Sequence, residues 1–131
     1  KFHAISDAHA EMMIKVAEAI AYNKNDRHIL IVENNGAIAN MQDDAMVEVV
    51  CELGINGPRP MRVGNIPQFN LGLLVNQVSC EKLIVDAYFE NSYQKALEAF
   101  TLNRLINDAK KARKVLDALI EANKGMWPEL R

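Results

Sequence analysis

The stretch that decides the fold runs from Asn34-Asn35-Gly36-Ala37-Ile38 through Cys51-Glu52-Leu53-Gly54 to Asn56-Gly57-Pro58. It predicts one strand, a turn-rich loop, a second strand and then a hairpin. The first strand is expected over residues 28–33, because its centre is the unbroken aliphatic run Ile29-Leu30-Ile31-Val32. Such a run is typical of a strand that is covered on both faces.

The second strand is expected over residues 46–53, where apolar and charged side chains alternate. One face comprises Val47, Val49, Cys51 and Leu53, and the other carries Glu48 and Glu52. A period of two residues indicates a strand with one buried and one exposed face. The turn over residues 54–58 should fold Met61-Arg62-Val63 back as the antiparallel partner of this strand.

A helix is expected ahead of the sheet. Ser6 or Asp7 can cap its first turn, and the turn-forming residues 23–26 should end it after about Ala21. Glu11 and Lys15 have the i, i+4 spacing of a helical ion pair. The apolar face of this helix consists of Met13, Val16, Ala17 and Ile20.

After Pro67 the pattern is helical to the end of the chain. One long helix is expected over residues 68–90, with an interruption allowed near Val78-Ser79, a second over 92–103 and a third over 108–123. Gly125 is a natural terminator for the last helix. The sequence therefore predicts one α+β domain, a small antiparallel or mixed sheet packed with helices.

Composition excludes several classes of partner. The chain has 131 residues, a net charge of −2 and a sequence pI of about 5.9, which gives no electrostatic reason to expect nucleic acid or an anionic membrane. The basic run at residues 110–114 is expected to be the solvated face of a helix. Cys51 and Cys80 lack metal-ligand spacing, favour a reducing compartment and are expected to be buried as small apolar residues.

Several pieces of the chain, taken in order, are similar to the family 4 glycoside hydrolases, above all the 6-phospho-α-glucosidases. These pieces are Asp7-Ala8-His9-Ala10, residues 31–38, Ala45-Met46-Val47-Glu48-Val49, Gly57-Pro58, Ile66-Pro67-Gln68-Phe69, Val78-Ser79-Cys80-Glu81-Lys82-Leu83, Ala122-Asn123-Lys124 and Trp127-Pro128-Glu129-Leu130. An Asn-Gly turn is common, so the ordered set carries the resemblance and no single motif does.

The resemblance implies the fold of the carboxyl-terminal domain of the lactate/malate dehydrogenase superfamily. Residues 1–131 would be the second domain of a larger enzyme, closing over the substrate and supporting a homo-oligomer. The dinucleotide-binding domain would lie upstream of Lys1. Because phosphorylated disaccharides arise on uptake into bacteria, the full-length enzyme would be cytoplasmic.

The resemblance also implies unusual chemistry. Members of the family use NAD and a divalent metal, usually manganese, to cleave a 6-phosphorylated glycoside, and they depart from the two-carboxylate mechanism. Hydride passes from C3 of the sugar to NAD, and the metal polarises the resulting ketone. A base then removes the C2 proton and the aglycone is eliminated, after which addition of water and re-reduction complete the cycle.

No catalytic, cofactor or metal role of the family is carried over to a residue of this chain. The six glycines form no G-x-G-x-x-G turn after a strand, and neither cysteine lies in a motif expected to provide a metal ligand. The chain by itself is therefore expected to bind neither NAD nor Mn²⁺ and to hydrolyse nothing.

His9 is the first candidate for contact with the substrate. It falls in the first turn of the predicted opening helix, on the face that carries Met13, Val16 and Ile20. The free N–H groups of a helix start disfavour a protonated imidazole, so a neutral His9 could hydrogen-bond the sugar, its phosphate or a metal-bound group. The alternative is a histidine buried at a domain interface with no chemical role.

Asn34 and Asn35 are the other candidates, because they follow a central strand and could reach the substrate from its end. Turn geometry beside Gly36 explains both residues equally well. The function expected for the full-length protein is that of a 6-phospho-α-glucosidase. The alternatives are a 6-phospho-β-glucosidase or α-galacturonidase of the same family, and a non-catalytic interaction module.

Overall fold

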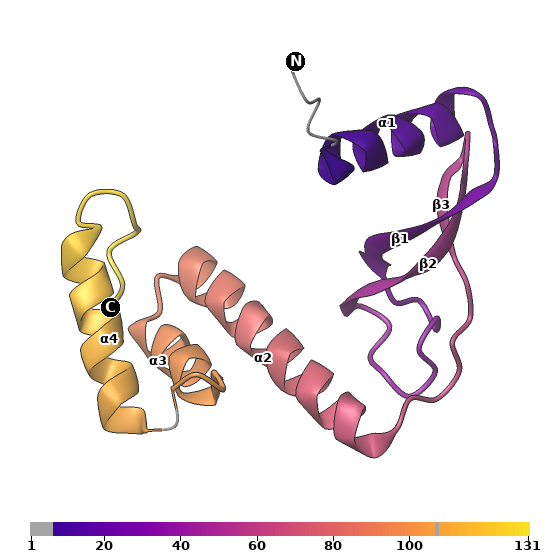
Figure 1. The fold of residues 1–131 in the computed structure, drawn as a ribbon. Coiled ribbons are helices and arrows are strands. Elements are labelled where there is room, and N and C mark those ends of the chain that lie inside the picture. The colour runs from indigo at the N-terminus through magenta and orange to yellow at the C-terminus, as the bar shows by residue number, and fades with distance from the viewer. Residues whose placement is uncertain (1–6, 107) are drawn as a thin grey trace, which may run out of the picture. The chain divides into compact units, whose positions relative to one another are not determined.

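The computed structural model describes residues 7–106 and 108–131, and the chain divides into two compact units between Ile66 and Pro67. The elements run in the order α1, β1, β2, β3, α2, α3 and α4 (Figure 1). The first unit holds α1 and the three strands, and the second holds the remaining helices. Each unit is described by itself.

Helix α1 spans Ala8–Ala21 and confirms the predicted opening helix. The side chain of Asp7 caps it by accepting hydrogen bonds from the backbone N–H groups of His9 and Ala10, while the alternative cap, Ser6, lies outside the described residues. The predicted ion pair is formed, with 2.7 Å between Lys15 Nζ and Glu11 Oε1. Local sequence therefore determines where this helix begins.

The predicted apolar face of α1 is largely uncovered in this chain. Met13 is 71% exposed and Ile20 is 40% exposed, and within α1 only Ala19 is buried. Its apolar side chains also extend around the helix to Met12 and Ile14. A helix with apolar residues on most sides is typical of one covered from several directions.

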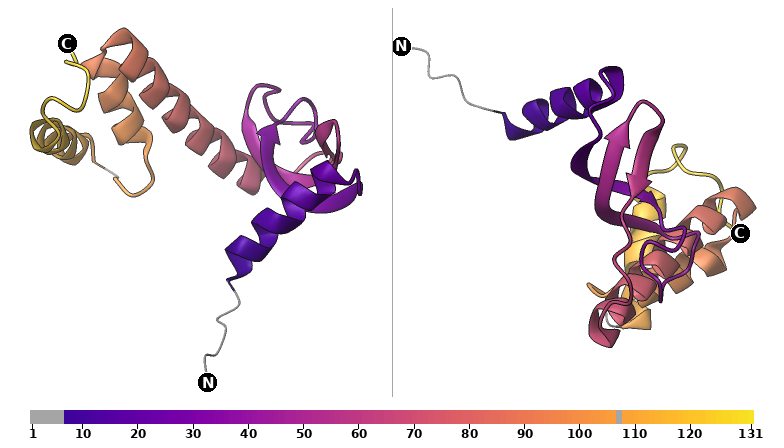
Figure 2. Two further views of the ribbon diagram at one scale, coloured as in Figure 1. Left: turned by 90° about the horizontal axis from the view of Figure 1, so that it is seen from above. Right: turned by 90° about the vertical axis from the view of Figure 1, so that its right-hand side faces the viewer.

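The strands form one antiparallel sheet in the order β1-β2-β3, with β1 at Asp26–Glu33, β2 at Met46–Gly54 and β3 at Gly57–Pro60 (Figure 2). The predicted alternation of β2 is confirmed, since one face of it is buried throughout. The buried side chains of β2 are Val47, Val49, Cys51 and Leu53. They form the core of this unit together with Ala19 and with residues of the loop that precedes β2.

The hairpin is tighter than predicted, so the expected partner strand at Met61-Arg62-Val63 was displaced. Gly54 pairs directly with Gly57, which leaves a two-residue turn, and β3 begins at Gly57. Met61 still donates its N–H to Val50 O, but the Val63 N–H goes to Ala37 O in the preceding loop. Pro58 and Pro60 are tolerated because β3 is an edge strand.

The expectation that β1 is covered on both faces was also wrong for this chain. Leu30 and Val32 point to the covered side and are half-buried, whereas Ile29 is 58% exposed and Ile31 is 68% exposed. The aliphatic run forms the predicted strand, but the described residues of the chain cover only one face of the sheet.

The second unit contains α2 at Gln68–Glu90, α3 at Tyr93–Leu102 and α4 at Ala109–Ala122. All three helices confirm the predicted ranges to within the capping residues, which are Ser92 for α3 and Asp108 for α4. The interruption allowed near Val78-Ser79 is absent. The hydroxyl of Ser79 donates to Val75 O at 2.8 Å, which satisfies this side chain inside a continuous helix.

The three helices pack around a small core of Ala87, Ala96 and Leu116. The side chains of Phe100 and Leu130 lie against this core. Small alanines at the contacts allow the helix backbones to approach closely. The predicted solvated face of α4 is confirmed, because Ala112 is buried while Lys110, Lys111, Arg113 and Lys114 are exposed.

Candidate functional site at the Asn34 loop

The loop that links β1 to β2, residues 34–45, is built around one buried polar side chain and is called here the Asn34 loop. Asn34 is fully buried, and it is the only buried polar or charged residue among the residues that the structure describes. Its Oδ1 accepts from the Ile38 N–H at 2.7 Å, and its Nδ2 lies 3.0 Å from Ile38 O and 3.2 Å from Met41 O. The carboxamide thus replaces the strand hydrogen bonds that the loop backbone lacks.

The backbone of Asn34 is bonded as fully as its side chain. Its N–H donates to Ala45 O at 2.8 Å and its carbonyl accepts from Ala37 N at 2.7 Å. Asn34 therefore joins both ends of the loop to its middle. This geometry supports a loop-forming role for Asn34, which the sequence left open beside a substrate role.

Asn35 differs from Asn34 because its side chain is exposed. It has a positive φ of 41°, its N–H donates to Asp43 O at 2.9 Å, and its Nδ2 lies 3.1 Å from Glu33 Oε2. Gly36 follows with φ of 80°, so the chain turns through two successive residues in the left-handed region. The Asn35 carboxamide keeps its oxygen at the surface, where a polar ligand could meet it.

A second asparagine closes the loop, and sequence reasoning did not single it out. The Asn40 side chain accepts from the Ile66 N–H and donates to Ile66 O, both at 3.0 Å. Ala39 N donates to Gly64 O at 2.9 Å nearby. Asn40 and Ile66 are 26 residues apart in the sequence, so no local sequence pattern could have revealed these hydrogen bonds.

His9 lies in the first turn of α1, and its side chain is exposed. Its backbone N–H is 3.0 Å from the Asp7 carboxylate, which is the capping contact. Figure 2 shows the amino end of α1 well apart from the Asn34 loop. The structure of this chain therefore does not bring His9 together with Asn34 and Asn35 in one pocket.

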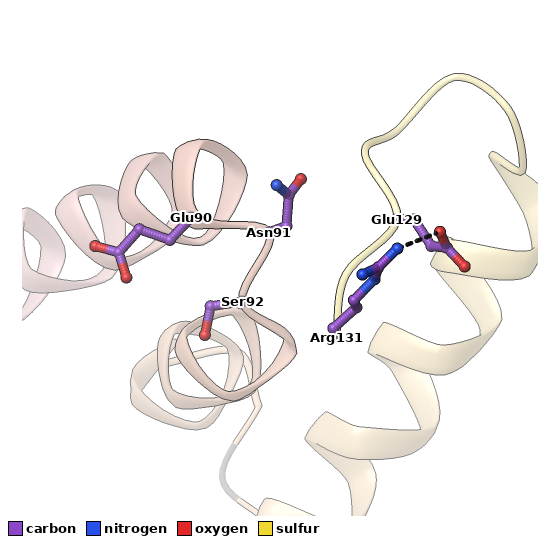
Figure 3. A pocket seen from close by; sticks show the side chains of 5 residues that line it. All are labelled: Glu90, Asn91, Ser92, Glu129 and Arg131. Carbon is purple, nitrogen blue, oxygen red and sulfur yellow. Dashed lines mark hydrogen bonds and ion pairs between the residues drawn. The ribbon is translucent and has the colours of Figure 1, made fainter.

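A polar hollow in the second unit combines charges of both signs (Figure 3). It lies between the connection of α2 to α3, with Glu90, Asn91 and Ser92, and the final residues Glu129 and Arg131. Glu129 Oε2 is 3.3 Å from Arg131 Nη2, and the backbone of Arg131 bonds to Asn91 O at 2.7 Å. The charges lie at the surface and partly neutralise each other, so this hollow gives no preference for an anion or a cation.

The thiols of Cys51 and Cys80 are free and buried, as predicted. Burial raises the pKa of each thiol, which disfavours the thiolate form needed for a metal ligand or nucleophile. Over residues 7–106 and 108–131, no group of three or more His, Cys, Asp or Glu side chains could hold a metal ion. The described residues thus do not fit a Mn²⁺ site, and no glycine-rich turn leads from a strand into a helix to fit a dinucleotide.

None of the described helices is both long and apolar enough to cross a membrane.

Comparison with known proteins places these elements in a family. Residues 2–106 match the family described as "Family 4 glycosyl hydrolase C-terminal domain". The chain is 54% identical over 124 residues to the maltose-6′-phosphate glucosidase of Bacillus subtilis (strain 168), and the match covers 95% of this chain and 28% of that protein. The chain thus spans under a third of the length of this curated relative.

Solved structures agree with the sequence comparison. A crystal structure of a 6-phospho-α-glucosidase from gut microorganisms, in complex with NAD and Mn²⁺, matches all of this chain and 30% of its own, with a TM-score of 0.96 and 83% identity. A second 6-phospho-α-glucosidase from gut microorganisms, in complex with NAD and glucose-6-phosphate, matches 94% of this chain and 28% of its own. That match has a TM-score of 0.91 and 49% identity.

Proposed function

We propose that this chain, which belongs to the family 4 glycosyl hydrolase C-terminal domains, is the carboxyl-terminal domain of a 6-phospho-α-glucosidase. The full-length protein would hydrolyse phosphorylated α-glucosides with NAD and Mn²⁺ as cofactors. One observation carries this proposal. The whole chain follows, at 83% identity, part of a 6-phospho-α-glucosidase that was crystallised with both cofactors.

The proposal assigns the redox and metal chemistry to the part of the full-length protein outside these residues. The cysteines are buried and unsuited to metal ligation, and the carboxylates and histidines of the described residues do not form a metal cluster. The role left for this chain is to cover the substrate and to support a homo-oligomer. The full-length enzyme would act in the cytoplasm.

Two of the candidate residues retain side chains that could meet the substrate. His9 is exposed in the first turn of α1, and its imidazole nitrogens can form hydrogen bonds with a sugar or a phosphate. Asn35 is exposed at the surface of the Asn34 loop. We assign to His9 and Asn35 contacts with separate parts of the phosphorylated disaccharide, because the two side chains do not lie in one pocket, and Asn34 acts by holding the loop that presents Asn35.

The experiment that tests this proposal is a hydrolysis assay of the full-length protein on a 6-phospho-α-glucoside and the matching 6-phospho-β-glucoside. Each substrate is assayed with both cofactors, without NAD and without Mn²⁺. Turnover of the α-glucoside that needs both cofactors supports the proposal. Preference for the β-glucoside would replace it by the 6-phospho-β-glucosidase alternative, and no turnover of either would favour a non-catalytic module.

A further inference from the structure

The side of the sheet that faces away from the core carries a group of large apolar residues, called here the outer sheet face. It consists of Ile29, Ile31, Met46 and Val50, which are 58%, 68%, 55% and 40% exposed. Ile29 pairs directly with Val50 across β1 and β2. Ile31 pairs with Glu48 and lies diagonally next to Val50 and Met46, so the four side chains form one patch.

This patch is unusual for an antiparallel sheet that has already filled its core. The opposite face of β2 is buried by its own unit, with Cys51 fully buried and Leu53 1% exposed. In an antiparallel sheet with one face in water, the residues on that face are normally polar. Here three of the four outward-facing residue pairs between β1 and β2 contain a large apolar side chain. Removing such residues from water is favourable by about 25 cal/mol per Å² of apolar area, so the patch favours a covering surface.

Glu48 indicates what kind of surface covers the patch. It lies between Met46 and Val50 on the outward side of β2 and opposite Ile31 on β1, at the centre of the apolar group. If two copies of this chain packed face to face about a two-fold axis through that centre, their Glu48 carboxylates would approach each other. Burying two like charges together is costly, so an unlike surface is favoured over a second copy of the same face.

We propose that the outer sheet face is the docking surface for the preceding part of the same polypeptide in the full-length protein. The inference rests on the proposed function, because it takes the chain to be one domain of a longer enzyme. A related crystallised protein is matched by this chain over only 30% of its length, and the family is described as a C-terminal domain. The docked surface is apolar over Ile29, Ile31 and Val50 and provides a cation or hydrogen-bond donors to Glu48.

The test measures the chemical accessibility of this face in the full-length protein. Ile31→Cys and Ile29→Cys place a thiol on the outer sheet face. Ile55→Cys places one on the two-residue hairpin turn, and Ile55 is a matched control because it is 65% exposed in the same unit. Labelling by a maleimide is followed by peptide mass spectrometry, at protein concentrations above and below those at which light scattering shows a monomer.

The proposal predicts complete labelling of the Ile55→Cys variant and loss of labelling at Ile31→Cys and Ile29→Cys, at every protein concentration. Protection that disappears when the protein dissociates to monomers would overturn it and assign the face to a second copy. Labelling of all three variants alike would overturn it by showing an open face.

The glucosidase assay on the same samples separates the two proposals. If Ile29→Cys and Ile31→Cys are protected from labelling but the protein has no glucosidase activity, the docking surface is supported and the proposed function is rejected. If the protein is active but both positions are labelled, the proposed function is supported and the docking surface is rejected. Two positions on the face are used so that a local packing defect at one of them does not decide the outcome.

Discussion

At the scale of single residues, the carboxamide of Asn34 is the contact on which the loop between β1 and β2 depends most. It is fully buried and bonded to the backbone of Ile38, Met41 and Gln42. Sequence alone could not distinguish this role from ligand binding, because an Asn before Asn-Gly is typical of turns and of sites alike. The distinction depends on burial, which packing of the whole loop decides.

Asn34→Ala is expected to lower the free energy of unfolding by about 3 kcal/mol, because it leaves the Ile38 N–H and several carbonyls buried without partners. Asn35→Gly is the control. It removes an exposed side chain, keeps a residue that tolerates the positive φ, and should change stability by less than about 1 kcal/mol. Urea denaturation measures both values, and equal losses for the two variants would contradict the structural role of Asn34.

His9→Ala in the full-length enzyme is expected to lower turnover while leaving stability within about 1 kcal/mol, because His9 is exposed and its side chain is not part of the cap of α1. Steady-state kinetics with a phosphorylated α-glucoside measures the first effect and thermal unfolding the second. Unchanged turnover would remove His9 from the substrate site. Lys110→Ala, on the exposed charged face of α4, serves as the control.

At the scale of elements, the helices were predictable because their signals are local. Asp7, Ser92 and Asp108 each accept a hydrogen bond from a backbone N–H of the first turn. Asp7 was predicted as a cap, and Ser92 and Asp108 were predicted as the first residues of their helices. The pairing of β3 was misplaced by four residues at its start, since Gly54 and Gly57 permit a tighter turn than the whole Gly-Ile-Asn-Gly-Pro run suggested. Register depends on contacts distant in sequence, which periodicity does not reveal.

The contact between α3 and α4 includes a hydrogen bond that should depend on pH. Tyr93 Oη donates to Asp117 Oδ1 at 2.7 Å, and this bond, followed by burial, raises the pKa of Tyr93 above its ordinary value. A raised pKa means that the contribution to stability is complete below the pKa of the unfolded chain. It is lost as the pH rises through the pKa of the folded protein.

Tyr93→Phe is therefore expected to cost about 1 kcal/mol of unfolding free energy at neutral pH, and the cost should vanish in strongly alkaline solution. Tyr88→Phe is the control, because Tyr88 is 58% exposed and contacts Phe89 through its ring. Urea denaturation at the two pH values gives the comparison. A cost for Tyr93→Phe that persists unchanged at alkaline pH would show that the hydrogen bond is not its cause.

At the scale of the whole molecule, the sequence indicated more apolar cover than these residues provide. The aliphatic run in β1 predicted a strand covered on both faces, yet Ile29 and Ile31 are open to water here. The same holds for Met13 and Ile14 on α1. Periodicity thus identified the apolar surfaces, but it could not say what covers them, and the docking surface proposed above would place a longer polypeptide on Ile29 and Ile31.

The central claim is that this chain is one domain of a cofactor-dependent glycosidase whose dinucleotide site lies in the preceding residues. Calorimetric titration of NAD into the full-length protein and into residues 1–131 tests it most directly. We expect saturable binding by the full-length protein and no binding heat from the shorter chain, whose described residues offer no glycine-rich turn between a strand and a helix. Binding of NAD by residues 1–131 with the affinity of the full-length protein would contradict the claim.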